Sequence, residues 1–546
     1  MSRRVDRSGR KSREVPAEKS DVAARLMTAP PSDRNVLATA KGGILLAAGS
    51  FSEFASRFVI ALLLANFLGA EHYGLYVLSI SAATIFMGIS ALGLDDAMVR
   101  YVAILFGRSD RVGIWGTLQI GLGVSALAGG VMGGVLLFGA RSIAEDLFNE
   151  PRLTPLLHLF AVVVPVLTMS NVLAGIARGF GRMDYAALAK NAVQPVVRMV
   201  LLAALAVTGR LDLFAAAVIF GISDVAAIIT LMLLLNKQVP LYESLRPYVR
   251  RDFKDIFVFA LPLWLSGLLR QFRRQIELVM LGALSAASSA GVFAVINKVN
   301  LVAHVFLLSI IVAVKPILAR LHDRRDQEEL AHLYVTATRW TLTLNVPFFL
   351  VMVLYAEPLL LVFGKTFASG ATALVILAFA ELVNAGTGIC GPMIDMTGHT
   401  KVKLANSVLW TILLISGGAL LIPRWGVVGA ATAALVAIST VNLLCVLEVW
   451  FLERLTPFNR TFWKPVAAGV VALIVGLMLR QWMPVGSDWE PAVLQAATTS
   501  TVYAGMLLLL GLAPEDRAVL DRLIKRIGMV IRRVRVVTGT ATGRLG

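Results

Sequence analysis

The sequence predicts an all-α, polytopic membrane protein with about fourteen transmembrane helices, and three observations lead to this prediction. The 546-residue chain is 57% hydrophobic and only 16% charged, whereas soluble domains are nearer half apolar and a quarter charged. The apolar residues fall in runs of ~20 or more, each long enough to cross a hydrocarbon core about 30 Å thick. Lys and Arg are concentrated in short loops and in both tails, which is typical of membrane topology.

The expected helices follow one another with short polar connections, of which the longest spans 237–255. Residues 1–41 are polar and basic, so they are expected to form a disordered cytoplasmic tail rather than a secretory signal peptide. The apolar runs lie at approximately 42–68, 74–94, 112–139, 153–176, 187–208, 211–236, 256–283, 288–315, 332–356, 368–394, 402–422, 426–452, 462–483 and 490–512.

The distribution of basic residues predicts the orientation of these helices. Alternate loops on the side of the N-terminal tail carry 18 Lys and Arg residues, and loops on the opposite side carry 6. Because basic loops stay in the cytoplasm, both termini are expected there, with the chain in the inner (plasma) membrane. The C-terminal segment 513–546 contains a basic amphipathic helix at 514–535, which suits the surface of an anionic leaflet.

An internal repeat divides the helices into two groups. At an offset of 217 residues, Gly74-Leu75-Tyr76-Val77-Leu78 aligns with Gly291-Val292-Phe293-Ala294-Val295. Many transporters are built from repeated helix bundles. We therefore expect an N-lobe at 42–236, a cytoplasmic linker at 237–255, a C-lobe at 256–453 and a further helix pair at 454–512.

Several ionisable residues lie inside the apolar runs, where each one costs several kcal/mol unless it is paired or hydrated. The main group occupies the first, seventh and eighth runs and contains five cations and two acids: Arg57, Arg270, Arg273, Arg274, Lys298, Glu53 and Glu277. Glu53 and Arg57 could pair internally at i,i+4, as could Arg273 and Glu277. The surplus of three positive charges cannot face lipid, so it predicts a hydrated cavity that binds an anion. Arginine is well suited to phosphate because its planar fork binds two oxygens.

Three further acids, Asp224, Glu381 and Glu448, could bind a coupling cation or simply line a cavity. Asp224 could instead pair with Arg198 within the N-lobe. The six histidines and two cysteines show no metal-ligand spacing, and no Gly-rich phosphate-binding loop of the Lys-Ser/Thr type is present. The sequence therefore predicts no metal, no cofactor and no ATP-driven mechanism.

Five segments resemble the polysaccharide transporter family of the MOP flippase superfamily, which includes the Wzx-type oligosaccharide flippases. They are Leu-Gly-Ala-Glu-His-Tyr-Gly-Leu-Tyr (68–76), Leu-Gly-Leu-Asp-Asp-Ala-Met-Val-Arg-Tyr-Val-Ala (92–103), Ala-Gly-Ile-Ala-Arg-Gly-Phe-Gly-Arg-Met (174–183), Ile-Glu-Leu-Val-Met-Leu-Gly (276–282) and Ala-Gly-Val-Phe-Ala-Val (290–295). The resemblance covers about residues 42–455. The chain departs from the family pattern at Glu277, where Asp is common, and at Arg273-Arg274, which the pattern does not require.

The resemblance implies a V-shaped pair of six-helix lobes around a cationic central cavity. It implies that a polyprenyl-diphosphate-linked oligosaccharide is flipped to the outer leaflet for cell-surface polysaccharide or lipopolysaccharide synthesis in the cell envelope. The implied partners are this lipid-linked oligosaccharide, membrane lipids, a glycan polymerase and glycosyltransferases.

Two other function classes remain to be compared with this one. A multidrug or metabolite antiporter of the same superfamily usually has twelve helices and favours cationic drugs, which an excess of arginine would repel. A membrane glycosyltransferase or polymerase needs sizeable outer loops, and the outer loops here have about a dozen residues at most, so we do not expect an enzyme. Nucleic acid is not an expected partner, because no basic stripe with interleaved aromatics is present.

Overall fold

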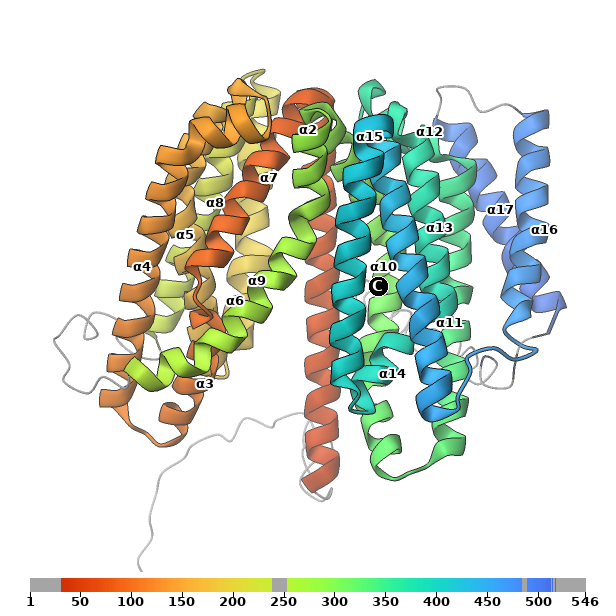
Figure 1. The fold of residues 1–546 in the computed structure, drawn as a ribbon, viewed down its shortest axis with the longest axis horizontal. Helices are drawn as coiled ribbons and strands as arrows, with labels where there is room; N and C mark the ends of the chain where they lie inside the picture. Colours follow the sequence, from red (N-terminus) through yellow and green to blue (C-terminus); the bar gives the residue numbers. More distant parts are fainter. Residues whose placement is uncertain (1–30, 238–252, 484–488, 512, 514–515, 517–546) are drawn as a thin grey trace, which may run out of the picture. The chain divides into compact units, whose positions relative to one another are not determined.

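The computed structural model describes residues 31–237, 253–483, 489–511, 513 and 516, and in this part of the chain all regular structure is helical (Figure 1). The helices before the predicted linker are α2 (Pro31–Ser90), α3 (Leu94–Gly107), α4 (Arg111–Ser142), α5 (Thr154–Gly179), α6 (Met183–Ala187), α7 (Gln194–Val207) and α8 (Leu213–Asn236). Short π or 3₁₀ turns accompany them at η1 (Ile143–Leu147), η2 (Pro151–Leu153) and η3 (Leu188–Val193).

The remaining helices follow the predicted linker in the sequence. They comprise α9 (Phe253–Leu284), α10 (Ala287–Asp323), α11 (Gln327–Leu354), α12 (Ala356–Leu361), η5 (Lys365–Gly370), α13 (Ala371–Thr387), α14 (Cys390–Met396), α15 (Thr400–Glu453), α16 (Trp463–Trp482) and α17 (Trp489–Leu509). Each predicted apolar run coincides with one or more of these helices and turns, which confirms the all-α, polytopic fold class.

The chain divides into two compact units, Met1–Ala55 and Ser56–Gly546. In the first unit the described residues form the beginning of α2, which starts at Pro31. Residues 31–41, the last part of the predicted tail, belong to this helix. Proline is tolerated at the first position of a helix because it needs no N–H donor there. The remainder of this predicted tail, most of the predicted linker and the predicted amphipathic C-terminal helix lie outside the described residues.

Two of the helices each contain two predicted runs. In α15 the backbone leaves the helical conformation at Gly426, and beyond this point Glu448 accepts a hydrogen bond from Asn406 of the first half. The helix therefore turns back on itself at this glycine. In α2 the break is at Gly69, between the first two predicted runs.

The number of membrane spans is not confirmed as fourteen. Within the described residues, eleven helices are long and apolar enough to cross a membrane, or up to twelve if the two parts of α10, which is bent by 41°, form one span. Ala55–Ser90 and Thr400–Glu453 each count once in this total, although each contains a break at a glycine.

Contacts between the helices of the second unit define two groups. The first contains α3, α4, α5, α7 and α8, and the second contains α10, α11, α13 and α15. The helices α16 and α17 pack against each other and against α11 (Figure 1). Helix α9 contacts α3 of the first group and α10 and α15 of the second.

The two repeats meet at equivalent residues. A Cβ atom on Gly74 of α2 would lie 1.8 Å from the carbonyl oxygen of Ala287, and one on Gly291 of α10 would lie 2.1 Å from that of Ala70. The offset of 217 residues relates Gly74 to Gly291 and Ala70 to Ala287. The contact is therefore reciprocal, as expected where two copies of one motif pack around a pseudo-two-fold axis.

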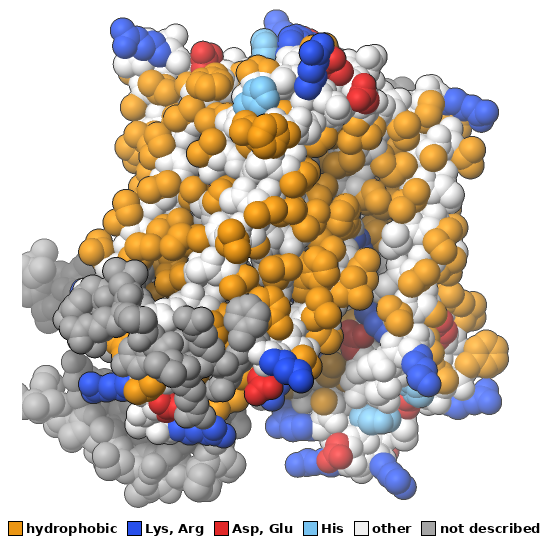
Figure 2. Space-filling view, turned by 60° about the vertical axis from the view of Figure 1, so that its left-hand side comes forward, with side chains coloured by type: hydrophobic (Ala, Val, Ile, Leu, Met, Phe, Trp, Pro, Cys, Tyr) orange, Lys and Arg blue, Asp and Glu red, His pale blue; other side chains and the backbone are white. Residues whose placement is uncertain are grey.

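Apolar side chains form a broad band on the face shown in Figure 2, and charged side chains gather above and below it. Large hydrophobic residues such as Phe138, Val207 and Trp482 are highly exposed. In water this surface would aggregate, whereas in a bilayer it is solvated by acyl chains. The chain is a multi-pass membrane protein.

Candidate functional site

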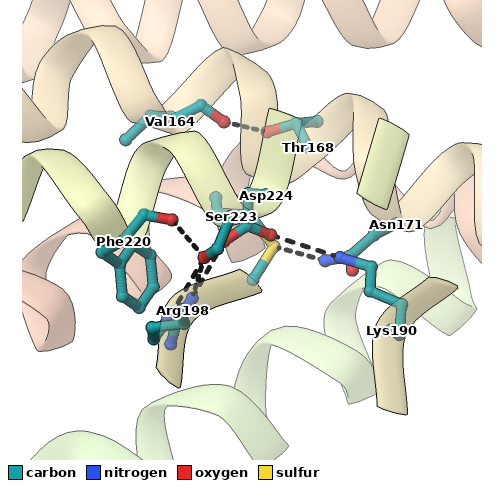
Figure 3. A network of polar contacts seen from close by, with 9 residues as sticks. Val164, Thr168, Asn171, Lys190, Arg198, Phe220, Ser223 and Asp224 are labelled. Atoms are coloured by element: carbon teal, nitrogen blue, oxygen red, sulfur yellow. Dashed lines mark hydrogen bonds and ion pairs between the residues drawn. The ribbon is translucent and has the colours of Figure 1, made fainter. Parts of the chain in front are cut away.

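A buried acid in the first helix group holds two cations (Figure 3). Asp224 of α8 is fully buried, and its two oxygens lie 3.6 Å from Lys190 Nζ and 3.4 Å from Arg198 Nη2. Arg198 also donates two hydrogen bonds to Ser223 Oγ, at 3.0 and 2.8 Å. Its guanidinium lies 4.0 Å from the centroid of the Phe220 ring. The acid therefore fixes the positions of both cations.

The local backbone explains how Lys190 reaches this acid. Lys190 lies in η3, a π-helical turn, and Pro195 follows at the start of α7. Proline supplies no N–H for the helical ladder. A π-turn inserts one extra residue into a helix and so changes the direction of the side chains before it. Lys190 is directed toward α8 in this way.

The charge of Arg57 interacts electrostatically with that of Lys190 and with that of Lys298. These residues come from η3, α2 and α10, so the group draws on both repeats. Together with Arg198 and Asp224 they form a cationic cluster of four cations and one acid. We use the name cationic cluster for these five residues.

The sequence predicted part of this cluster. It identified Arg57 and Lys298 as members of one group, and the structure brings them close enough to interact. The pair between Arg198 and Asp224 is also present. Lys190 was not predicted. Its position inside the apolar run at 187–208 was the available signal, because a lysine there needs a partner as much as an arginine does.

The three arginines of α9, Arg270, Arg273 and Arg274, are exposed. Arg273 lies over the indole ring of Trp410 in α15, with its guanidinium carbon 4.3 Å from the ring centroid. Its charge also interacts with that of the partly buried Glu277. Among the contacts between described residues, none joins Arg270 or Arg274 to the cationic cluster. The side chain of Glu53 lies outside the described residues.

A second buried acid lies in the other helix group. Glu381 of α13 lies 3.1 Å from Nδ1 of His304 in α10, and it accepts a hydrogen bond of 3.3 Å from Asn384. Asn442 of α15 in turn donates to Asn384 at 3.0 Å. This acid is held mainly by neutral amides and by one histidine, whose charge depends on pH. Glu448, the third predicted acid, accepts its hydrogen bond from Asn406.

The described residues contain no group of three or more His, Cys, Asp or Glu side chains that could hold a metal ion. Cys390 and Cys445 are both buried and both free thiols.

Comparisons with known proteins concern the family and the fold of this chain. The sequence model of a family described as polysaccharide biosynthesis protein matches residues 39–322, and the model described as MatE matches residues 262–419. The chain is 31% identical over 163 residues to the stage V sporulation protein B of Bacillus subtilis (strain 168). It is 27% identical over 180 residues to the capsular polysaccharide biosynthesis protein CapF of Staphylococcus aureus. These matches cover 29% and 33% of this chain, and only 30% and 46% of the two relatives.

Solved structures show the same fold. The lipid II flippase MurJ, in an inward closed conformation, aligns with a TM-score of 0.66 at 14% identity, covering 86% of this chain and 98% of that one. A multidrug resistance MATE family transporter of the MOP superfamily, in an inward-facing conformation, aligns with a TM-score of 0.63 at 17% identity, covering 74% and 94%. At these identities the likeness concerns the fold alone.

Proposed function

Since this chain belongs to the polysaccharide biosynthesis protein family, we propose that it flips a polyprenyl-diphosphate-linked oligosaccharide across the inner membrane by alternating access. The resemblance predicted from the sequence, to the polysaccharide transporters of the MOP superfamily, is confirmed by the family match and by the shared fold. The chain is a multi-pass transporter of this superfamily. The glycan-linked substrate and the role in cell-surface polysaccharide or lipopolysaccharide synthesis are the proposed parts.

The observation that carries this proposal is the cationic cluster. A surplus of positive charge inside a membrane protein is stable only if an anion or water compensates it. A diphosphate offers negative charge and several acceptor oxygens, which match the fork of Arg198 and the point charges of Lys190 and Lys298. A glycan alone, or a cationic drug, would leave these charges uncompensated.

The other predicted residues have subordinate roles in this mechanism. We place Arg270, Arg273 and Arg274 along the approach to the cluster, because an exposed row of arginines attracts an anion before it binds. Glu53 and Glu277 would partly neutralise the positive charge of these arginines, so that the substrate is bound weakly enough to be released. The lipid tail would stay in the bilayer while the head group crosses.

The energy would come from the membrane rather than from ATP. An inside-negative potential favours outward movement of an anion by roughly 2.3 kcal/mol per charge per 100 mV. Among the acids proposed for ion coupling, Asp224 is already neutralised by two cations. Glu381 and Glu448 have amide or histidine partners instead, so we assign coupling to these two.

The proposed setting follows from the distribution of charge. Both termini would be cytoplasmic, and glycosyltransferases would supply the substrate inside the cell while a polymerase uses it outside. We propose no catalytic activity, because the solved structures that share this fold include a flippase and a transporter and the proposed substrate crosses unchanged.

The test is genetic complementation in a strain that lacks the native gene, with surface glycan as the readout. Lys190→Gln should lower surface glycan by roughly tenfold or more, because one charge-assisted contact to the diphosphate is lost. Lys190→Arg should retain most of it. Arg210→Gln, an exposed arginine that follows α7, is the matched control and should have no effect. Normal glycan from Lys190→Gln at normal membrane abundance would contradict the proposal.

The match to the MatE model supports one second candidate, a multidrug or metabolite antiporter. This function predicts export of an organic cation that does not depend on Lys190. Drug efflux by the purified protein in vesicles, unchanged in Lys190→Gln, would favour it over the flippase.

A further inference from the structure

A separate cavity lies between α3 and the beginning of α9, away from the cationic cluster. It has a volume of about 560 Å³ and is lined by Arg100, Tyr101, Asp255, Val258, Phe259, Pro262 and Leu263. Most of this lining is apolar, but it contains one cation and one acid. The proposed transport mechanism gives no role to Arg100 or to Asp255.

The cation is held in a fixed position. The guanidinium carbon of Arg100 lies 4.2 Å from the centroid of the Phe259 ring. Tyr101 packs edge-on against the same ring, and its hydroxyl donates a hydrogen bond of 2.8 Å to the carbonyl oxygen of Asp255. Stacking on a ring leaves the edge of a guanidinium available for hydrogen bonds. Among the described residues, no acidic side chain forms an ion pair with Arg100, so its donors can bind an anion.

One wall of the cavity is continuous with an exposed apolar surface. Val258, Leu261, Leu265 and Leu269 are all more than half exposed, and their spacing of three or four residues places them on one face of α9. This helix is long and apolar enough to span a membrane. A molecule in the cavity would therefore have acyl chains or water beside it rather than more protein.

We propose that this cavity binds a membrane phospholipid whose head group carries both a phosphate and a primary ammonium. The phosphate would accept hydrogen bonds from Arg100, and the ammonium would donate to the carboxylate of Asp255. The upper part of the acyl chains would pack on Val258, Pro262 and Leu263. One cation and one acid sum to zero charge, which matches a zwitterionic head group and disfavours a diphosphate.

Native mass spectrometry of the full-length protein in detergent tests this directly. The probes are phosphatidylethanolamine, phosphatidylcholine and phosphatidylglycerol at equal concentrations. Phosphatidylcholine keeps the phosphate but has no N–H donor, and phosphatidylglycerol has no ammonium. The wild-type protein should retain phosphatidylethanolamine roughly tenfold better than either of the others, as one charge-assisted hydrogen bond implies.

Three variants separate the contributions of the cavity residues. Arg100→Gln should reduce retention of phosphatidylethanolamine roughly tenfold, while Arg100→Lys should preserve most of it. Asp255→Asn should lower retention of phosphatidylethanolamine to the level of phosphatidylcholine. The matched control is Arg108→Gln, because Arg108 is an exposed arginine at the end of α3 and is not part of the cavity lining.

Three results would overturn the proposal. The first is equal retention by Arg100→Gln and Arg108→Gln when both melt at the wild-type temperature. The second is retention of phosphatidylglycerol as strong as that of phosphatidylethanolamine. The third is displacement of the phospholipid by farnesyl diphosphate in a manner that depends on Arg100, which would assign the cavity to the transport path. None of these results bears on the Lys190 test.

Discussion

The two helix groups each contain a buried acid, and the two acids have opposite kinds of partner. Asp224 in the first group is surrounded by Lys190 and Arg198. Glu381 in the second is held by His304 and Asn384. A carboxylate between two cations serves to position them. A carboxylate beside one amide and one histidine does not hold a pair of fixed cations.

Under the proposed function, this difference would divide the work between the repeats. The first would present fixed positive charge to an anionic substrate, and the second would supply the acid that responds to an ion gradient. Two copies of one ancestral motif would then have kept the same packing at their contact while their polar residues diverged. Substitutions in each half can test this division.

The largest effect is expected from Asp224→Asn. This variant leaves Lys190 and Arg198 without their counter-ion, and breaking a buried pair in this way typically costs about 3–5 kcal/mol. We expect a large fall in the melting temperature of the detergent-solubilised protein and low membrane abundance. Asp224→Glu, which keeps the charge, should recover most of the stability. Wild-type stability in Asp224→Asn would mean that this acid does not position the cations.

A smaller effect is expected where the two repeats touch. Gly74→Ala and Gly291→Ala each place a methyl group within about 2 Å of a backbone carbonyl oxygen of the facing helix. Overpacking of this kind costs roughly 1–3 kcal/mol. Because the contact is reciprocal, both variants should lower the melting temperature by similar amounts.

The control for these glycines is Gly123→Ala in α4. A Cβ atom at Gly123 would meet nothing within 4 Å, and alanine favours a helix by up to about 1 kcal/mol over glycine. This variant should be neutral or slightly stabilised. Unequal effects of Gly74→Ala and Gly291→Ala would weaken the pseudo-symmetric interpretation of the contact.

The smallest effect on stability is expected from Glu381→Gln. Glutamine is close to isosteric with glutamate and retains an acceptor for Asn384. The free energy of unfolding should therefore change by no more than about 1 kcal/mol, with a correspondingly small change in melting temperature. Transport should instead lose its dependence on the ion gradient. The measurement is substrate translocation in vesicles with and without a proton or sodium gradient. A loss of stability equal to that of Asp224→Asn would remove the contrast between the two acids.

The sequence by itself determined the helices, their membrane setting and the repeat. These features are local or periodic, so they can be recognised from hydrophobic runs, from loop charge and from the offset that aligns Gly74 with Gly291. It also identified which residues carry charge inside the apolar runs, including Arg57, Lys298 and Asp224. Each of these residues can be recognised because it is a charged side chain within an apolar run, where little water is expected.

Only the tertiary structure decided which of these charges meet. The direction of a side chain around a helix axis depends on helix crossings and on local irregularities, and neither is visible in the composition of a run. The π-turn before Pro195 brings Lys190 to Asp224. The arginines of α9 do not contact the cationic cluster, although the sequence placed them in one group with Arg57 and Lys298. The cavity at Arg100 likewise exists only because α3 and α9 pack together, since no sequence pattern connects two segments so far apart.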